Sequence, residues 1–393
     1  MQGNELDARD RVILAITGLL SYFVLSGTLA PIGLLIEPLA NLYELSPAGA
    51  ARVLSGFTTG NLVGAFLALF LLGRLLYRSL AFSIYVGAAV ALVLLAFVKQ
   101  TTMIWLLLGF LGVNLGMGLA LAAQLIALSY QKDQRAALLV ATDSSFSLAG
   151  TLMATLTAYL LLNPISGLPI WLNSYLAIFC LVLLILALVA TTKYPEAELT
   201  GANWSWMKRM PRSVWIVGIA LYCYTLGQTS ILLWLPSLIQ LTTNDANLGA
   251  EVVGRYWFGM FLGQIFAIVL VLAIGRRRVL AIGAVGACSG ALVVANVPID
   301  RSVILWASLG WGFFNLGILK MLVSLATDCA KDLPDQLVPT LLLLATLGTA
   351  CSPIVTSWLV EGFSQMTALM FGVGAMIFML GLTIVAYRSS AVR

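Results

Sequence analysis

Long apolar runs, separated by short polar segments, fill nearly the whole sequence. The runs do not alternate between polar and apolar residues, as the strands of a membrane β-barrel would. About 20 apolar residues suffice for a helix to cross a bilayer, and backbone groups in lipid must be satisfied within their own segment. We count twelve such runs, six on each side of one longer polar stretch. The pattern therefore predicts an all-α integral membrane protein with twelve transmembrane helices.

Polar and turn-forming residues set the limits of these predicted helices. The first spans residues 12–43 with breaks at Pro31 and Pro38, and Ser46 caps a second helix that starts at Pro47. The seventh spans 214–241 and is interrupted at Gly227 and Pro236, whereas the tenth starts near Ser302 as one helix. Other predicted limits are 80–98 for helix 3, 102–130 for helix 4, 136–162 for helix 5, an end near 192 for helix 6, 279–297 for helix 9, a start near 337 for helix 11 and an end near 387 for helix 12.

Two stretches of the chain occur twice at nearly the same offset. WLLLGFLGVNLG from Trp105 and WASLGWGFFNLG from Trp306 share a Trp, a Gly four residues later and a final Asn-Leu-Gly. A second set repeats with identical internal spacing, namely Arg52, Gly56, Gly60 and Asn61 with Arg255, Gly259, Gly263 and Gln264. Two repeats at one offset indicate that the first half was duplicated to make the second. We therefore predict an N-terminal bundle over residues 1–192, a linker over 193–213 and a C-terminal bundle over 214–393.

Composition narrows the class further. Of the 393 residues, 61% are hydrophobic and only 9% are charged, against about 25% charged in soluble domains. The sequence has no histidine, no acidic cluster and no glycine-rich phosphate loop, so we predict no enzyme, no cofactor and no metal site. The five cysteines stand singly in apolar runs and fit small hydrophobic residues.

The basic residues indicate orientation rather than nucleic-acid binding. With the N-terminus inside, most of the 21 Lys and Arg residues lie on the inner side, which places both termini in the cytoplasm by the positive-inside rule. Lys320 lies within the membrane. The basic residues that fall outside are Arg52, Lys99, Arg255 and Arg301.

Doubled six-helix halves, a basic central linker and Gly-Arg turns after helices 2 and 8 resemble the major facilitator superfamily over the whole chain. Within it, ATDSSFSLAG (141–150) and LYCYTLGQTSILLWLP (221–236) are similar to the TsgA-type branch of the fucose–galactose–glucose:proton symporter family. The resemblance implies a bacterial inner-membrane transporter that handles substrate where its halves meet. Sugar symporters of the related branch use carboxylates in helices 1 and 4, whereas here helix 4 has no acid and helix 1 keeps Glu37.

Two charges break the repeat. Lys320 corresponds to Leu119 in the first copy, and Asp143 corresponds to Leu342 in the second. A charge near the centre of a membrane helix costs roughly 2.5–3.5 kcal/mol, so each must face inward and find a partner. We expect the two to pair across the halves on the cytoplasmic side and to act as an inner gate; pairing within each half, or a lysine that reaches the inner surface, is the alternative.

The outer ends of the helices carry a second charged set. Glu37 can pair with Arg255 across the halves or with Arg52 within the first half. Both arginines can equally lie in the headgroup layer and anchor the starts of their helices.

Neutral amides and aromatic rings lie at mid-depth in the predicted helices. Hydroxyl groups pair with amides, and sugar rings stack on aromatic faces, so the set suits a small polyol or sugar. An amide can instead bond a neighbouring helix, an alternative that is strongest at the repeated positions Asn114 and Asn315. The candidate substrate contacts are Asn61, Asn114, Gln124, Gln228, Gln264, Asn315, Tyr22, Tyr224, Phe146 and Trp311.

The sequence thus predicts a secondary active transporter that moves a small, sugar-like solute by alternating access, with protons as the coupling ion. We expect a monomer in contact with membrane lipid and no nucleic-acid partner. A uniporter or an exporter of an anionic solute remains an alternative because Lys320 is cationic. A second alternative is a transporter-shaped receptor or scaffold that moves nothing.

Overall fold

The computed structural model describes residues 6–72, 74–196, 210–329 and 337–391, and every regular element in those ranges is a helix. The middle of the predicted linker, residues 197–209, lies outside the described residues. The chain forms two compact units, one of residues 1–43 and 53–202 and the other of residues 44–52 and 203–393. The second unit thus includes residues 44–52, which contain the start of the helix Pro47–Leu71; the rest of this helix belongs to the first unit.

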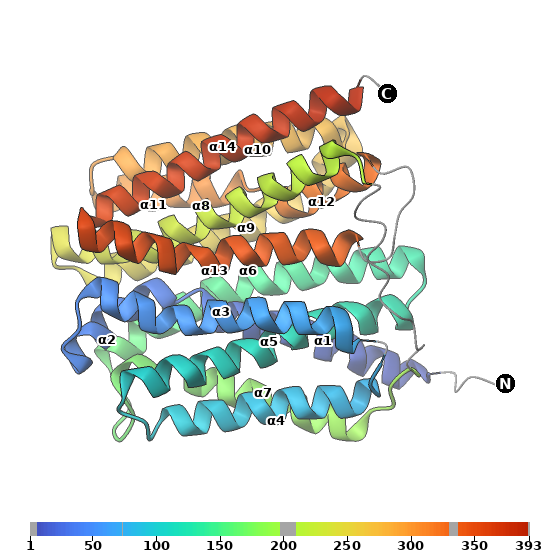
Figure 1. Ribbon diagram of the computed structural model, residues 1–393, viewed down its shortest axis with the longest axis horizontal. Coiled ribbons are helices and arrows are strands. Elements are labelled where there is room, and N and C mark those ends of the chain that lie inside the picture. Colours follow the sequence, from blue (N-terminus) through green and yellow to red (C-terminus); the bar gives the residue numbers. More distant parts are fainter. Residues whose placement is uncertain (1–5, 73, 197–209, 330–336, 392–393) are drawn as a thin grey trace. The chain divides into compact units, whose positions relative to one another are not determined.

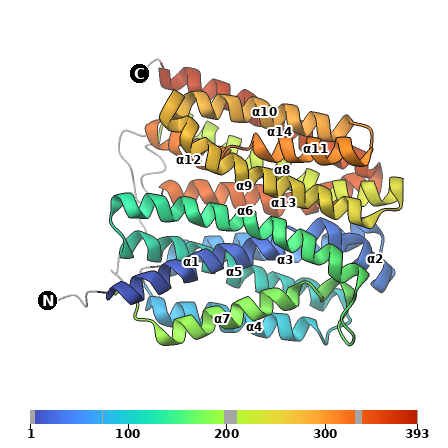
Figure 2. The same ribbon diagram turned by 180° about the vertical axis from the view of Figure 1, so that it is seen from behind.

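Helices of the first unit lie side by side in both views (Figures 1 and 2). Helix α1 packs against α5, α6 and α7, and α4 packs against α5 and α7. The elements are α1 (Ala8–Leu29), η1 (Ile32–Leu35), α2 (Ile36–Tyr43), α3 (Pro47–Leu71), α4 (Tyr77–Leu95), α5 (Thr101–Ser129), α6 (Lys132–Leu162), η2 (Ile170–Leu172) and α7 (Tyr175–Thr191).

In the second unit, α8 is the central helix. It contacts α9, α12, α13 and α14, and it buries most of its length. The elements are α8 (Arg212–Thr243), α9 (Ala246–Ile274), α10 (Arg276–Asn296), α11 (Arg301–Phe313), α12 (Ile318–Cys329), α13 (Leu337–Gly362) and α14 (Gln365–Ala391).

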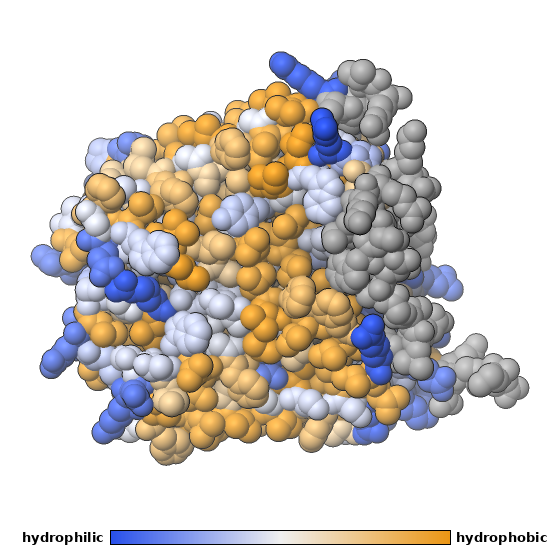
Figure 3. Space-filling view, viewed as in Figure 1, coloured by the Kyte–Doolittle hydropathy of each residue, from blue (hydrophilic) through white to orange (hydrophobic). Residues whose placement is uncertain are grey.

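The predicted spans are confirmed. Within the described residues, eleven helical stretches are long and apolar enough to cross a membrane, and α7 is a shorter apolar helix of 17 residues that completes the twelve. Large apolar side chains are exposed along these helices, including Leu272 at 84% and Trp306 at 70%. On the face shown in Figure 3, apolar residues cover most of the surface and hydrophilic ones gather near its edges. Such a surface is stable in lipid and not in water.

Several predicted local features are confirmed and others are wrong. Helix α3 starts at Pro47, and the Ser46 hydroxyl accepts a hydrogen bond from the Gly49 amide at 3.0 Å, as predicted for a cap. The first helix breaks at Pro31 but not at Pro38, which lies in the first turn of α2, where its missing N–H is not needed.

The predicted interruption of the seventh helix is also wrong. Helix α8 runs unbroken through Gly227 and Pro236. A methyl group at Gly227 would lie 2.6 Å from the Gly372 carbonyl oxygen of α14, so this glycine allows two helices to approach closely.

The tenth helix, predicted as one piece, is two. Helix α11 ends at Phe313 and α12 starts at Ile318, with Leu316 at φ +37° and Gly317 at φ +69° between them. The matching Asn-Leu-Gly of the first half, residues 114–116, lies inside the continuous helix α5.

The repeated glycines bring helix backbones into contact. A methyl group at Gly60 of α3 would lie 1.9 Å from the Gly109 carbonyl oxygen of α5. In the second unit, the corresponding Gly263 of α9 would place one 2.1 Å from the Phe313 carbonyl oxygen of α11. Only hydrogen fits at such distances, so the same glycine in each copy allows a close helix contact. Its partner lies one turn further along in the second unit, because Phe313 corresponds to Gly112 and not to Gly109.

Candidate functional site

A buried group of amide, phenol and indole side chains lies inside the second unit. The Gln228 side-chain amide on α8 donates a hydrogen bond to the Tyr256 hydroxyl on α9 at 2.5 Å. The Tyr256 ring lies 4.2 Å, centroid to centroid, from the Trp311 ring on α11. Trp311 is 1% exposed, and its indole nitrogen has no hydrogen-bond partner among the residues that the structure describes. Three helices thus bring polar and aromatic groups together, two of which, Gln228 and Trp311, were predicted as substrate contacts.

A second contact in this unit joins α8 to the helix break. The Tyr224 hydroxyl donates to the Asn315 side-chain oxygen at 2.8 Å, and the Asn315 amide donates to the Trp311 carbonyl at 2.8 Å. Asn315 is fully buried. Its amide therefore bonds its own helix and its neighbour, which is the arrangement expected of the structural alternative at this position. We call Tyr224, Gln228, Tyr256, Trp311 and Asn315 the second-unit polar cluster.

The equivalent asparagine in the first unit is held in the same way. The Asn114 amide donates to the Phe110 carbonyl at 2.7 Å, and its side-chain oxygen packs against Gly87 of α4. Nearby, the Tyr85 hydroxyl of α4 and the Ser21 hydroxyl of α1 are 2.5 Å apart. The two copies of the asparagine thus share their intrahelical bond and differ in their neighbours.

The remaining predicted contacts are distributed over both units. Asn61 of α3 and Tyr22 of α1 are buried, whereas Gln124 of α5 and Gln264 of α9 are half-buried. Phe146 of α6 is half-buried, and its carbonyl accepts a hydrogen bond from the Ser26 hydroxyl at 2.6 Å.

The two charges that break the repeat lie in different units. Asp143 is half-buried on α6 in the first unit, and Lys320 is half-buried on α12, one turn after the helix break, in the second. Their pairing stays a prediction.

Arg52 forms an ion pair with an acid that the sequence did not single out. Its guanidinium donates to both carboxylate oxygens of Glu361, on α13, at 2.7 Å and 3.3 Å. Both residues belong to the second unit. Glu37 is half-buried in α2, and Arg255 is exposed on α9. Because 309 residues separate Arg52 from Glu361, no local pattern could have indicated this pair.

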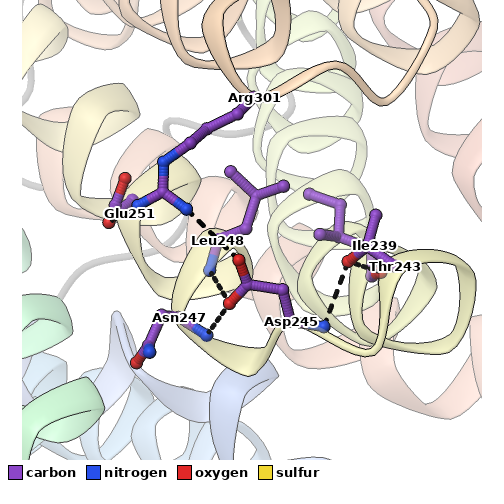
Figure 4. Close-up of polar contacts among 7 residues, drawn as sticks. All are labelled: Ile239, Thr243, Asp245, Asn247, Leu248, Glu251 and Arg301. Atoms are coloured by element: carbon purple, nitrogen blue, oxygen red, sulfur yellow. Dashed lines mark hydrogen bonds and ion pairs between the residues drawn. The ribbon is translucent and has the colours of Figure 1, made fainter.

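Two further ion clusters hold the ends of helices in the second unit. Arg301 pairs with Asp245 at 3.2 Å and with Glu251, and Asp245 caps α9 by accepting from the Asn247 and Leu248 amides (Figure 4). At the opposite end of the α11–α12 segment, Arg276 of α10 donates to the Ser324 hydroxyl and the Asp328 carboxylate of α12.

Tyr256 is the member of the cluster that sequence reasoning missed. It follows Arg255 directly, where the first copy of the repeat has Val53. The same comparison of copies that singled out Lys320 would have found it, because a phenol replaces an apolar residue at an otherwise repeated site. Among the described residues, no group of three or more His, Cys, Asp or Glu side chains could hold a metal ion.

Comparison with known proteins identifies the family to which this architecture corresponds. The sequence profile of the Major Facilitator Superfamily matches residues 14–341. A protein TsgA homolog of Erwinia tasmaniensis is 27% identical over 95% of this chain and 94% of its own length, and protein TsgA of Shigella flexneri is 24% identical over 92% and 91%.

Solved structures share the fold at low sequence identity. The nucleoside transporter NupG matches with a TM-score of 0.72 at 12% identity, covering 96% of this chain and 99% of its own. A D-xylose–proton symporter matches with a TM-score of 0.71 at 16% identity, covering 94% and 96%. The E. coli fucose:proton symporter FucP matches with a TM-score of 0.67 at 18% identity, covering 96% and 99%.

Proposed function

Because the chain belongs to the major facilitator superfamily of membrane transporters, we propose that it carries a small, neutral, hydroxyl-rich solute across the bacterial inner membrane. Transport proceeds by alternating access of the two bundles, with both termini in the cytoplasm, and is coupled to protons. The observation that carries the proposal is the buried Gln228–Tyr256–Trp311 contact, in which an amide, a phenol and an indole from three helices meet.

The chemistry of the second-unit polar cluster supports a neutral substrate. Its side chains are amides, phenols and an indole, which hydrogen-bond hydroxyl groups and offer flat apolar faces to a sugar ring. The indole N–H of Trp311 is buried and finds no acceptor within the described part of the chain, so a solute hydroxyl would supply one. The names of the proteins that share the fold, a fucose symporter, a D-xylose symporter and a nucleoside transporter, agree with such a solute.

We assign substrate contact first to Gln228, Tyr224 and Trp311 of the cluster. Asn315, the fourth predicted contact in it, instead joins α8 to the helix break through its two hydrogen bonds. The other predicted contacts belong to the proposed path of the solute through the two bundles. Asp143 with Lys320 stays the proposed inner gate. At the outer end, Arg52 holds Glu361, which supports a role of this arginine in fixing helix ends.

Uptake into liposomes that contain only this protein tests the proposal. Pentoses, hexoses, polyols, nucleosides and sugar acids are offered in turn, and protein-free liposomes set the background. We expect uptake of a neutral member of this set, with Gln228→Ala raising the KM about tenfold. Thr242→Ala is the matched control on the same helix, because its hydroxyl bonds only its own turn in the contacts described. If only sugar acids are taken up, the transported solute is an anion and not a neutral molecule. Saturable binding without uptake would favour a receptor.

Proton coupling has its own readout in the same vesicles. For symport into vesicles, the pH of a weakly buffered external medium rises as solute enters, and an imposed inward proton gradient drives accumulation above the external concentration. Equilibration without accumulation would establish a uniporter.

A further inference from the structure

The second unit gathers arginines where α10 begins and α14 ends. Helix α10 starts with Arg276, Arg277 and Arg278, and α14 carries Arg388 in its last turn. The two helices pack side by side (Figures 1 and 2). The Arg277 guanidinium lies over the Tyr387 ring, 5.5 Å from its centroid, so the start of one helix is held against the end of the other.

One of these arginines is already paired, because Arg276 binds Ser324 and Asp328 of α12. We call the other three, Arg277, Arg278 and Arg388, the arginine cluster. Their side chains are exposed and make no ion pair among the described residues. The remaining acids that the structure describes in this unit have other roles: Asp245 and Glu251 bind Arg301, Asp300 caps α11 and Glu361 binds Arg52.

The first half keeps the corresponding turn without this charge. GRLLYR at 73–78 corresponds to GRRRVL at 275–280, so Leu75 and Leu76 occupy the positions of Arg277 and Arg278. Leu75 is 44% exposed and Leu76 is 70% exposed. Since these positions are exposed in both copies, packing inside the bundle does not account for the arginines. A partner outside the bundle does.

Apolar side chains continue from the arginine cluster along the exposed faces of both helices. Ile282 and Val285 follow Arg278 on α10 at the spacing of one helix face, and both are exposed. On α14, Ile384 precedes Arg388 by one turn and is exposed as well. Charge thus stands at the depth of lipid headgroups, and apolar surface lies beside it at the depth of acyl chains.

We propose that the arginine cluster binds the phosphodiester headgroup of an anionic phospholipid, whose acyl chains lie against the exposed faces of α10 and α14. Guanidinium groups donate paired hydrogen bonds to phosphate oxygens, and Tyr387 holds one of the three in place. A free phosphate ion offers the same oxygens but makes no use of the apolar faces. The site stands on the second unit alone; that its leaflet is the cytoplasmic one rests on the proposed function.

Thermal unfolding of the full-length protein in a neutral detergent, with increasing amounts of phosphatidylglycerol, tests the site. We expect a saturable rise of the melting temperature that phosphatidylcholine does not produce. Arg278→Gln and Arg388→Gln should each weaken the apparent affinity about fivefold, and the double variant roughly twentyfold. Arg74→Gln is the matched control, because it removes the same charge from an exposed arginine of the corresponding turn in the first unit.

Three results of this titration would overturn the proposal. Equal stabilisation by both lipids would remove the selectivity for negative charge. An equal loss in Arg74→Gln would assign the effect to net charge and not to the cluster. Arg388→Lys keeps the charge and should bind within about twofold of the unchanged protein, so a loss as large as that of Arg388→Gln would assign this arginine a structural role.

Inorganic phosphate separates the lipid from a free anion. At equal ionic strength, phosphate in place of chloride should neither raise the melting temperature nor compete with phosphatidylglycerol. Stabilisation by phosphate alone that is lost in the double variant would make the site one for a soluble anion and overturn the assignment to lipid.

A measurement in membranes serves even if the variants unfold in detergent. Spin-labelled phosphatidylglycerol and phosphatidylcholine are compared in vesicles that contain the protein. The motionally restricted fraction should be larger for phosphatidylglycerol, and the excess should fall in the Arg278→Gln, Arg388→Gln double variant. Equal fractions, or an excess that the double variant retains, would refute the site. No solute is present in these experiments, so they and the uptake assay can fail independently.

Discussion

The contact between Gly60 and the α5 backbone gives a quantitative prediction. A methyl group at Gly60 would lie 1.9 Å from the Gly109 carbonyl oxygen, whereas ordinary contact begins at 3.4 Å, so the helices would have to separate by about 1.5 Å, the difference of those values. The obstacle is a backbone oxygen inside a helix, which cannot rotate away. Gly56 and Gly64 make similar approaches one turn on either side, so separation loosens all three contacts.

We expect Gly60→Ala to destabilise the protein by about 2 kcal/mol, within the 1–3 kcal/mol typical of overpacking, which is roughly thirtyfold in the unfolding equilibrium. The matched control is Gly374→Ala on α14, where nothing lies within 4 Å of the added methyl group. There the higher helix propensity of alanine should stabilise by up to ~1 kcal/mol. Thermal and denaturant unfolding of the purified proteins in one detergent, followed by intrinsic tryptophan fluorescence, measures both.

The duplication supplies an independent replicate. Gly263→Ala in the second unit should behave as Gly60→Ala does, because its methyl group would lie 2.1 Å from the Phe313 carbonyl oxygen. Equal stability of Gly60→Ala and Gly374→Ala would refute the close crossing. A loss at Gly60 without one at Gly263 would refute the close helix contact in the second unit.

Three further predictions concern a helix cap, the substrate site and the proposed gate. The Ser302 hydroxyl and two backbone amides donate to Asp300 and hold the pKa of this carboxyl below its ordinary value. The contribution of the Asp300 carboxylate to stability is therefore present above a pH of about 4 and is lost as the pH falls through the lowered pKa. Asp300→Ala should lower the melting temperature at pH 7 but not under strong acid, and a pH-independent difference would contradict the cap. Gln228→Ala should weaken solute binding about tenfold in a thermal-shift titration, and unchanged affinity would remove Gln228 from the site. Asp143→Lys and Lys320→Asp should each abolish uptake and the double exchange should restore part of it; failure of the exchange would leave direct pairing without support.

Sequence alone determined the class of the molecule and its internal duplication. Apolar runs long enough to span a bilayer specify helices because lipid offers the backbone no other hydrogen-bond partner, and the structure confirms these spans. The cap at Ser46 was predictable because its cause lies within three residues. The cluster members Gln228, Tyr224 and Trp311 could be named from residue type, but not the contacts that they make.

Tertiary structure decided what depends on neighbours distant in the chain. Gly227 and Pro236 do not interrupt α8, because surrounding helices enclose this helix. Identical Asn-Leu-Gly segments are helical in α5 but form a break after α11. The neighbours of the two copies differ. In the second copy α10 presents Gly283 and Gly286 to Leu316 and Phe314, and Tyr224 bonds Asn315, whereas in the first copy Gly87 of α4 faces the asparagine itself. A left-handed backbone conformation costs only about 1–2 kcal/mol, so the surrounding tertiary contacts decide whether the chain adopts it. The sequence of one segment does not show which contacts these are.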